Sequence, residues 1–315
     1  PENEILLRVN GQLIWRGSKV GHLEKSQKIL NPKVKLIKSD ELDKISLEKI
    51  QRKLDIFIEN KVKTLMPNLL TIANNDKLRG ATAGFAHIFV NNLGVIMKSE
   101  VMEQFNSIDN ESKVKLRNFG IRFGYKTIYD ATLLKPEASK LRIALFNVFY
   151  APPWASLFYP PPGLVTVEYD KHISKKQYLV AGFFVAGNRA IRIDMLERLF
   201  FMIKEYSKDE WIVIQPAMLS ITGLGLEKFT ELIRSLRFDI KHEKIEKGNE
   251  VITFEKDDEH YKVSFKKQLI NKRVKLMPAS ETFKKKKQSG KKNRAKKQMP
   301  TNDSPFSMLK VLIKN

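Results

Sequence analysis

One internal segment combines basic, aromatic and glycine residues in a way that could bind nucleic acid. Residues 120–129 read Gly-Ile-Arg-Phe-Gly-Tyr-Lys-Thr-Ile-Tyr. The cations of Arg122 and Lys126 could contact phosphates, and the ring of Tyr125 could stack on a base, while the two glycines let the backbone approach closely. The same pattern is equally typical of a buried strand or turn that carries basic residues on its surface. The sequence leaves both interpretations open.

A second group of candidate residues lies late in the sequence, where nine of the fourteen residues from 284 to 297 are basic. They are Lys284, Lys285, Lys286, Lys287, Lys291, Lys292, Arg294, Lys296 and Lys297. Of the formal net charge of +22, residues 266–315 supply +14, with 16 Lys and Arg against 2 Asp and Glu. This segment has too few apolar residues for a core, so we expect it to be disordered when free and to bind nucleic acid without sequence preference. The alternative is a tail that only keeps the chain soluble.

The residue types that catalysis or metal binding would need are not arranged for either. The chain has no cysteine, no G-x-x-x-x-G-K-[ST] phosphate loop, and five histidines that never pair at metal-ligand spacing. Residues 257–260, Asp-Asp-Glu-His, superficially resemble the D-E-x-H box of helicases, but His follows Glu directly and no apolar strand precedes them. We therefore expect no catalytic residue, no metal site and no cofactor in this chain. Whether the intact protein is an enzyme stays open.

Hydrophobic periodicity predicts an α+β fold that is mainly helical, with small β-hairpin elements. Asn10-Gly11 between two apolar runs predicts a hairpin, and apolar residues at helical spacing predict a long helix over residues 42–66 that stops at Pro67. Composition divides the chain into six expected parts. These are a β-hairpin plus long helix (1–75), a helical domain (76–151), a Pro-rich connector (152–163), an α+β domain (164–265), a basic low-complexity tail (266–303) and a short C-terminal helix (304–315).

The expected order of elements in the α+β domain is that of a winged helix. We expect a helix from Asp194, a short helical turn over 216–222, a break at Gly223-Leu224-Gly225, a helix over 226–236, strands at 238–247 and 250–255 around Gly248-Asn249, and a further strand at 261–265. Many domains with this order bind nucleic acid, whereas others bind proteins or simply pack.

Several stretches of the sequence, taken together, resemble a known helicase family. They are residues 120–129, Leu133-Leu134-Lys135-Pro136, Val180-Ala181-Gly182-Phe183, residues 192–199 and Ser304-Pro305-Phe306. In combination they are similar to the C-terminal, non-motor portion of alphaproteobacterial superfamily-two helicase-like proteins, which are relatives of the mitochondrial RNA-degradation helicase. The resemblance covers nearly the whole chain.

The resemblance implies a nucleic-acid-binding accessory region of an ATP-dependent helicase, without motor motifs of its own. RNA is then a more expected partner than DNA, and helicase motor domains, in cis or in trans, would bind the ATP and Mg²⁺. A chain that starts at Pro1 is then expected to be a piece of a longer or split protein, cytoplasmic and with no membrane partner. One alternative is a free-standing RNA- or ribosome-associated binding protein. Another is a metal-dependent nuclease, which would need several carboxylates in one cleft.

Overall fold

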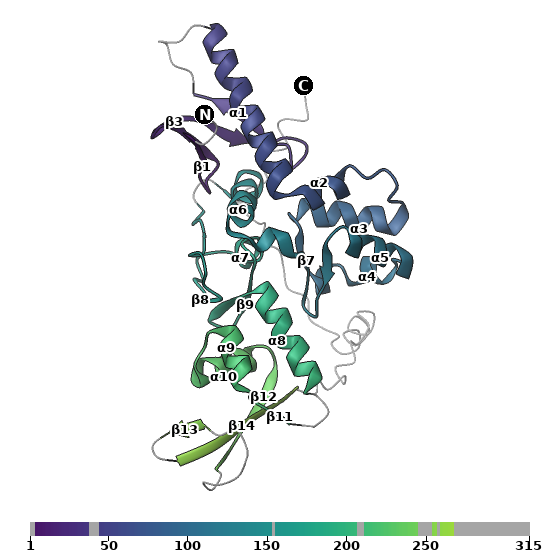
Figure 1. The fold of residues 1–315 in the computed structure, drawn as a ribbon, viewed down its shortest axis with the longest axis vertical. Coiled ribbons are helices and arrows are strands. Elements are labelled where there is room, and N and C mark those ends of the chain that lie inside the picture. The colour runs from purple at the N-terminus through teal and green to yellow at the C-terminus, as the bar shows by residue number, and fades with distance from the viewer. Residues whose placement is uncertain are drawn as a thin grey trace, which may run out of the picture. The chain divides into compact units, whose positions relative to one another are not determined.

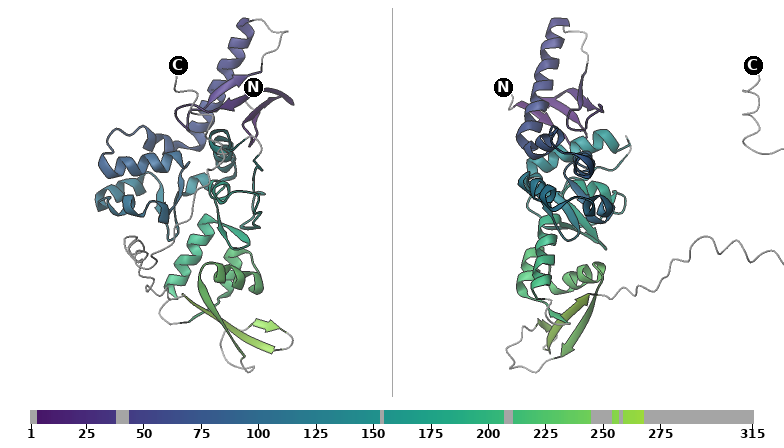
Figure 2. Two further views of the ribbon diagram at one scale, coloured as in Figure 1. Left: turned by 180° about the vertical axis from the view of Figure 1, so that it is seen from behind. Right: turned by 90° about the vertical axis from the view of Figure 1, so that its right-hand side faces the viewer.

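The computed structural model describes residues 4–37, 44–152, 155–206, 211–244, 254–256 and 259–267. Residues 1–268 form one compact unit (Figures 1 and 2). The fold is mixed α and β with small antiparallel sheets, and more of the described residues lie in helices than in strands, as the sequence predicts at that level. The basic segment 284–297 and the C-terminal helix expected at 304–315 lie outside the described residues.

A four-stranded sheet begins the chain, in the order β1-β2-β3-β4. Its strands are β1 (Ile5–Leu7), β2 (Gln12–Trp15), β3 (Ser18–Glu24) and β4 (Lys33–Leu36). The predicted hairpin is confirmed, because Leu7 pairs with Leu13 and Gly11 in the turn has a φ of +81°, which glycine adopts without strain. Helix α1 (Lys44–Leu65) lies within the predicted range and ends just before Pro67.

The part expected to be a helical domain also contains a three-stranded sheet, in the order β5-β7-β6. Its strands are β5 (Val95–Met97), β6 (Ile121–Phe123) and β7 (Thr127–Asp130). Helix α2 (Pro67–Ala73) precedes this part, whose helices are α3 (Gly80–Asn91), η2 (Lys98–Glu100), α4 (Met102–Asn106), α5 (Asn110–Asn118), η3 (Ala131–Leu134) and α6 (Pro136–Tyr150). Asp109 caps α5, its side chain accepting from the Ser112 N–H at 2.7 Å.

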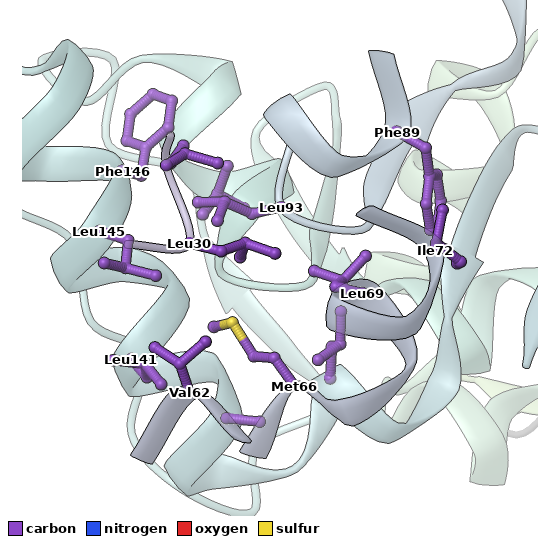
Figure 3. Packing of buried hydrophobic residues seen from close by; sticks show 14 of the residues in the cluster. Leu30, Val62, Met66, Leu69, Ile72, Phe89, Leu93, Leu141, Leu145 and Phe146 are labelled. Carbon is purple, nitrogen blue, oxygen red and sulfur yellow. The ribbon is translucent and has the colours of Figure 1, made fainter. Parts of the chain in front are cut away.

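The first hydrophobic core joins the N-terminal sheet to these helices. Figure 3 shows side chains from α1, α2, α3 and α6 meeting around Met66 and Leu69, which are fully buried. The buried residues of this core run from Leu7 to Phe149, with Val180 added from further along the chain. The long helix and the middle of the chain therefore share one apolar interior.

The remaining described residues form a third sheet, a helical group and a fourth sheet. The first elements are β8 (Thr166–Glu168), α7 (Lys175–Val180), β9 (Phe183–Ala186) and β10 (Arg189–Arg192). They are followed by α8 (Ile193–Glu205), β11 (Ile212–Val213), α9 (Pro216–Thr222), α10 (Leu226–Ser235), β12 (Phe238–Lys244), β13 (Phe254–Lys256) and β14 (Glu259–Lys267). The predicted break between two helices is confirmed, because Gly223 ends α9 in the left-handed conformation at a φ of +66°. A second core fills this part, from Ala186 to Phe265.

The pairing of the last strands differs from the predicted hairpin. Strand β14 lies between β11 and β12, and β12 pairs with it from Phe238↔Lys267 to Lys244↔Tyr261. Strand β13, which overlaps the strand expected at 250–255, pairs with β14. The strand predicted at 261–265 is therefore the central strand of the sheet. The turn expected at Gly248-Asn249 lies outside the described residues.

The Pro-rich connector is held to the rest of the chain by an aromatic side chain. Phe158 packs against Tyr178, with ring centroids 4.0 Å apart, and against Phe183 at 6.3 Å. In the described part of 152–163 no residue lies in a helix or a strand, as five prolines require. Phe158 thus contributes to packing, which is the commoner role of aromatics in such connectors.

Candidate nucleic-acid interface

The three candidate residues of the internal segment lie on one β-hairpin, formed by β6 and β7. Arg122 is exposed on β6, and Tyr125 and Lys126 occupy the turn. The turn is tight, because the Gly124 N–H donates to the Thr127 carbonyl at 2.8 Å. The segment is therefore a partly buried strand pair that presents a basic and aromatic turn, so it combines the two interpretations that the sequence left open.

A carboxylate from a distant part of the chain holds this turn in place. The successive backbone N–H groups of Tyr125, Lys126 and Thr127 all donate to Glu197 on α8, at 3.0 Å for Lys126 and 2.9 Å for Thr127. The Thr127 hydroxyl adds a bond of 2.8 Å. Successive N–H groups of a turn form a concave anion-binding site, and here the anion belongs to the chain itself. A Cβ at Gly124 would lie 2.6 Å from both carboxylate oxygens, so a larger residue there would displace Glu197 from the turn.

A ring contact joins the same turn to the same helix. Tyr125 stacks on Phe200 of α8, with ring centroids 4.5 Å apart and planes inclined by 20°. The Lys126 ammonium lies 5.7 Å from the Tyr125 centroid and 5.6 Å from that of Phe200, within the range of cation–π attraction. Glu197 and Phe200 are one helical turn apart, so α8 fixes both the backbone of the turn and its aromatic side chain.

Replacing Glu197 with Ala is expected to lower the free energy of unfolding by about 2 kcal/mol, because bonds to a charged acceptor contribute about 1.5–3 kcal/mol each and solvent can replace part of them. Glu205→Ala is the matched control. It removes an exposed carboxylate from the same helix, and we expect a change below about 0.5 kcal/mol. Urea denaturation of both variants makes the comparison. Equal, small effects would show that Glu197 does not anchor the turn.

Three further cations lie beside the hairpin, each over an aromatic ring. The ammonium groups of Lys98 and Lys113 are 5.6 and 4.7 Å from the centroid of Phe105. The Arg117 guanidinium is 5.2 Å from the centroid of Phe123. The two rings contact each other edge to face at 5.0 Å. The aromatic pair thus restricts the positions of three cations, which lowers the entropy lost when they bind an anion.

Lys98 connects these cations to the turn of the hairpin. Its backbone N–H donates to the Lys126 carbonyl at 2.9 Å, and its ammonium donates to the Gly124 carbonyl at 3.3 Å. We call the five cations around the hairpin the basic collar: Lys98, Lys113, Arg117, Arg122 and Lys126. Among the residues that the structure describes, none of the five lies within ion-pair distance of a carboxylate. Their positive charge is available to an external anion.

Two acidic residues of α8 that lie near the hairpin are already bonded within the chain. Asp194 at the start of α8 accepts two bonds from Arg192, at 2.7 and 3.0 Å, and Glu197 accepts those of the turn. Their charges are felt at Tyr129, where burial first, and then Glu197 and Asp194, raise the pKa of the phenol, while Arg122 opposes this. Tyr129 is therefore a neutral group at physiological pH.

Of the five residues of the collar, only Arg122 and Lys126 were predicted from the sequence. Lys113 and Arg117 are four residues apart on α5, a spacing that places them on one face of the helix, but the sequence does not show that this face lies beside the hairpin. Glu197 and Phe200 come from more than seventy residues further along the chain. The basic residues of 284–297 lie outside the described residues, so their relation to the collar is a matter for experiment.

The described residues offer no second site of a different chemical kind. No group of three or more His, Asp or Glu side chains within them could hold a metal ion. The solvent-facing side of α10 has mixed charge, with Glu227 and Glu231 beside Lys228 and Arg234. Such a face does not attract a phosphate backbone as the collar does.

Comparisons with known proteins do not place the chain in a family. No family model, no curated protein and no solved structure matches it. A search of the described helices finds none long and apolar enough to cross a membrane.

Proposed function

We propose that this chain is a nucleic-acid-binding accessory region of an ATP-dependent helicase, with RNA as the preferred polymer. The basic collar is the observation that carries the proposal. Five cations surround one hairpin, four of them lie over aromatic rings, and the carboxylates of Asp194 and Glu197 are bonded within the chain. Ordered cations of this kind neutralise phosphates and release counterions.

We further propose that residues 194–267 are a winged-helix-like domain. The order α8, β11, α9, α10, β12 and β14 supports this assignment, as does a sheet in which the last strand lies between the first and the second. In such domains the third helix commonly enters a nucleic-acid groove. The mixed charge of α10 does not favour that use here, so we assign the domain to positioning the hairpin through Glu197 and Phe200.

The resemblance of the sequence to helicase accessory regions suggests helicase motor domains as the partner. Motor domains, in cis or in trans, would provide ATP hydrolysis and Mg²⁺ binding, while this chain would hold or guide the strand. A free-standing RNA- or ribosome-associated binding protein would use the same collar. Testing whether the chain changes the strand-separation rate of a motor partner distinguishes the two functions, because only an accessory region should do so.

Replacing Lys113 and Arg117 with Ala tests the collar directly. Each phosphate contact contributes about 0.7 to the slope of log affinity against log salt for a single strand, so the double variant should lower that slope by about 1.4. At about 0.1 M salt the affinity should fall about 25-fold. The matched control is Lys33→Ala with Lys49→Ala, which removes two exposed cations from β4 and α1. Equal losses in the two double variants would assign binding to net charge rather than to the collar.

A further inference from the structure

Tyr125 differs from the other aromatic residues of the hairpin in its exposure. It is 51% exposed, although one side of its ring stacks on Phe200, which is only 5% exposed. Phe105 and Phe123 are half-buried, and cations of the collar lie over their rings. Tyr125 is therefore the most exposed of these aromatic side chains.

The position of the Tyr125 ring is fixed before any ligand arrives. Its backbone N–H and those of the next two residues bond to Glu197, and the ring rests on Phe200 one helical turn later. Phe200 is itself part of the second core. A ring held at both its backbone and its face loses little conformational freedom on binding, which favours affinity.

Two cations of the collar lie close to this ring. The Lys126 ammonium is 5.7 Å from the Tyr125 centroid, and Lys98 reaches the carbonyl of the preceding residue, Gly124. An aromatic surface flanked by cations is the arrangement with which proteins bind single strands, since every base has a face that can stack and every nucleotide has a phosphate. Bases inside a duplex already stack on each other and cannot offer that face.

We infer that Tyr125 is a stacking platform for one unpaired base, and hence that the ligand of the collar is single-stranded nucleic acid rather than duplex. The inference rests on the proposed function. It concerns one base, because the neighbouring rings of Phe105 and Phe123 serve to position cations.

The test compares two substitutions of Tyr125 in the full chain. Tyr125→Leu keeps an apolar cover over Phe200 but removes the aromatic ring, whereas Tyr125→Phe keeps the ring. The probes are a 12-nucleotide single-stranded RNA, the same backbone without bases, and a blunt duplex of equal length. We expect Tyr125→Leu to bind the single strand about tenfold more weakly and the base-free backbone equally well, while Tyr125→Phe stays within about twofold of the native chain.

A second measurement uses the native protein, so that it does not depend on how a variant folds. A 2-aminopurine base in the single strand should lose fluorescence on binding, because stacking on an aromatic ring quenches it. Unchanged fluorescence, or equal affinity of the native chain for the RNA and the base-free backbone, would overturn the stacking platform while leaving phosphate binding by the collar intact. No binding of any probe would instead overturn the proposed function itself.

Discussion

Deleting residues 284–297 is expected to lower the affinity for a single-stranded RNA by about three orders of magnitude at 0.1 M salt. If about five of the nine cations contact phosphates at once, the slope of log affinity against log salt should fall by about 3.5. For a duplex, the slope of log affinity against log salt should fall by about 4.5. By contrast, Arg122→Ala with Lys126→Ala should reduce the slope by at most about 2, because these residues can make two contacts at most.

The deletion also shortens the chain, so a second variant separates length from charge. Replacing the nine basic residues with Ser and Gln keeps all fourteen positions. Titrations over a range of salt concentrations should give the same lower slope for both variants. Unchanged affinity and slope in the deletion variant would mean that the segment is only a solubilising linker to residues 304–313. The case for nucleic-acid binding would then depend on the collar alone.

Replacing Arg142 with Met is expected to stabilise the fold by about 1 kcal/mol at pH 7, because it removes a buried cation that makes only one hydrogen bond within the described residues. Arg142 lies on α6 and is fully buried. Its Nη1 donates to the Leu133 carbonyl at 3.1 Å, while Nε and Nη2 have no partner among the described residues. Asp130, the nearest opposite charge, is already bonded to Asn68 and Thr132, so the substitution leaves no carboxylate without a donor.

The pH dependence of this gain provides a signature of the buried cation. Burial lowers the pKa of Arg142 to about 9, against the attraction of Asp130. Below pH 9 both the folded and the unfolded chain hold the proton, and the full cost of burying the charge is present. Above pH 9 the unfolded chain holds more protons than the folded chain, so the stability of the native protein rises with pH. The advantage of the Met variant should therefore shrink by about 1 kcal/mol between pH 9 and 10.

Denaturant unfolding of the native protein and the Met variant at pH 7, 9 and 10 measures this change. Lys140→Met on the same helix is the control, and it should change stability by less than about 0.5 kcal/mol at each pH. A Met variant that is less stable than the native protein by the same amount at every pH would contradict this account of Arg142.

Local signals were enough to predict several elements of the fold. Asn10-Gly11 predicted a hairpin because both residues tolerate positive φ, although only Gly11 of the two adopts it in the structure. Pro67 ended α1, and Gly223 ended α9, for equally local reasons. Strand β3 was not predicted. Its apolar residues, Val20 and Leu23, are too few for a clear alternation, and the strand is stabilised by pairing on both sides.

The pairing of strands that are distant in the sequence could not be predicted from the hydrophobic pattern. The sequence suggested that 238–247 would pair with the next strand along the chain, but β12 pairs with β14. Neighbouring strands do often pair, so the prediction followed the commoner case. In the candidate interface, Arg122, Tyr125 and Lys126 could be predicted because they lie within one short segment that is rich in basic and aromatic residues. Glu197 could not, since its role depends on contacts across more than seventy residues.

The salt dependence of RNA binding by the full chain is the most direct test of a nucleic-acid-binding function. Fluorescence anisotropy with a labelled 12-nucleotide single strand, at 50 to 300 mM KCl, measures it. We predict binding whose log affinity falls with log salt with a slope of about −4 or steeper, from phosphate contacts of the tail and the collar together. No binding at 50 mM KCl, or an affinity that does not change with salt, would contradict the account.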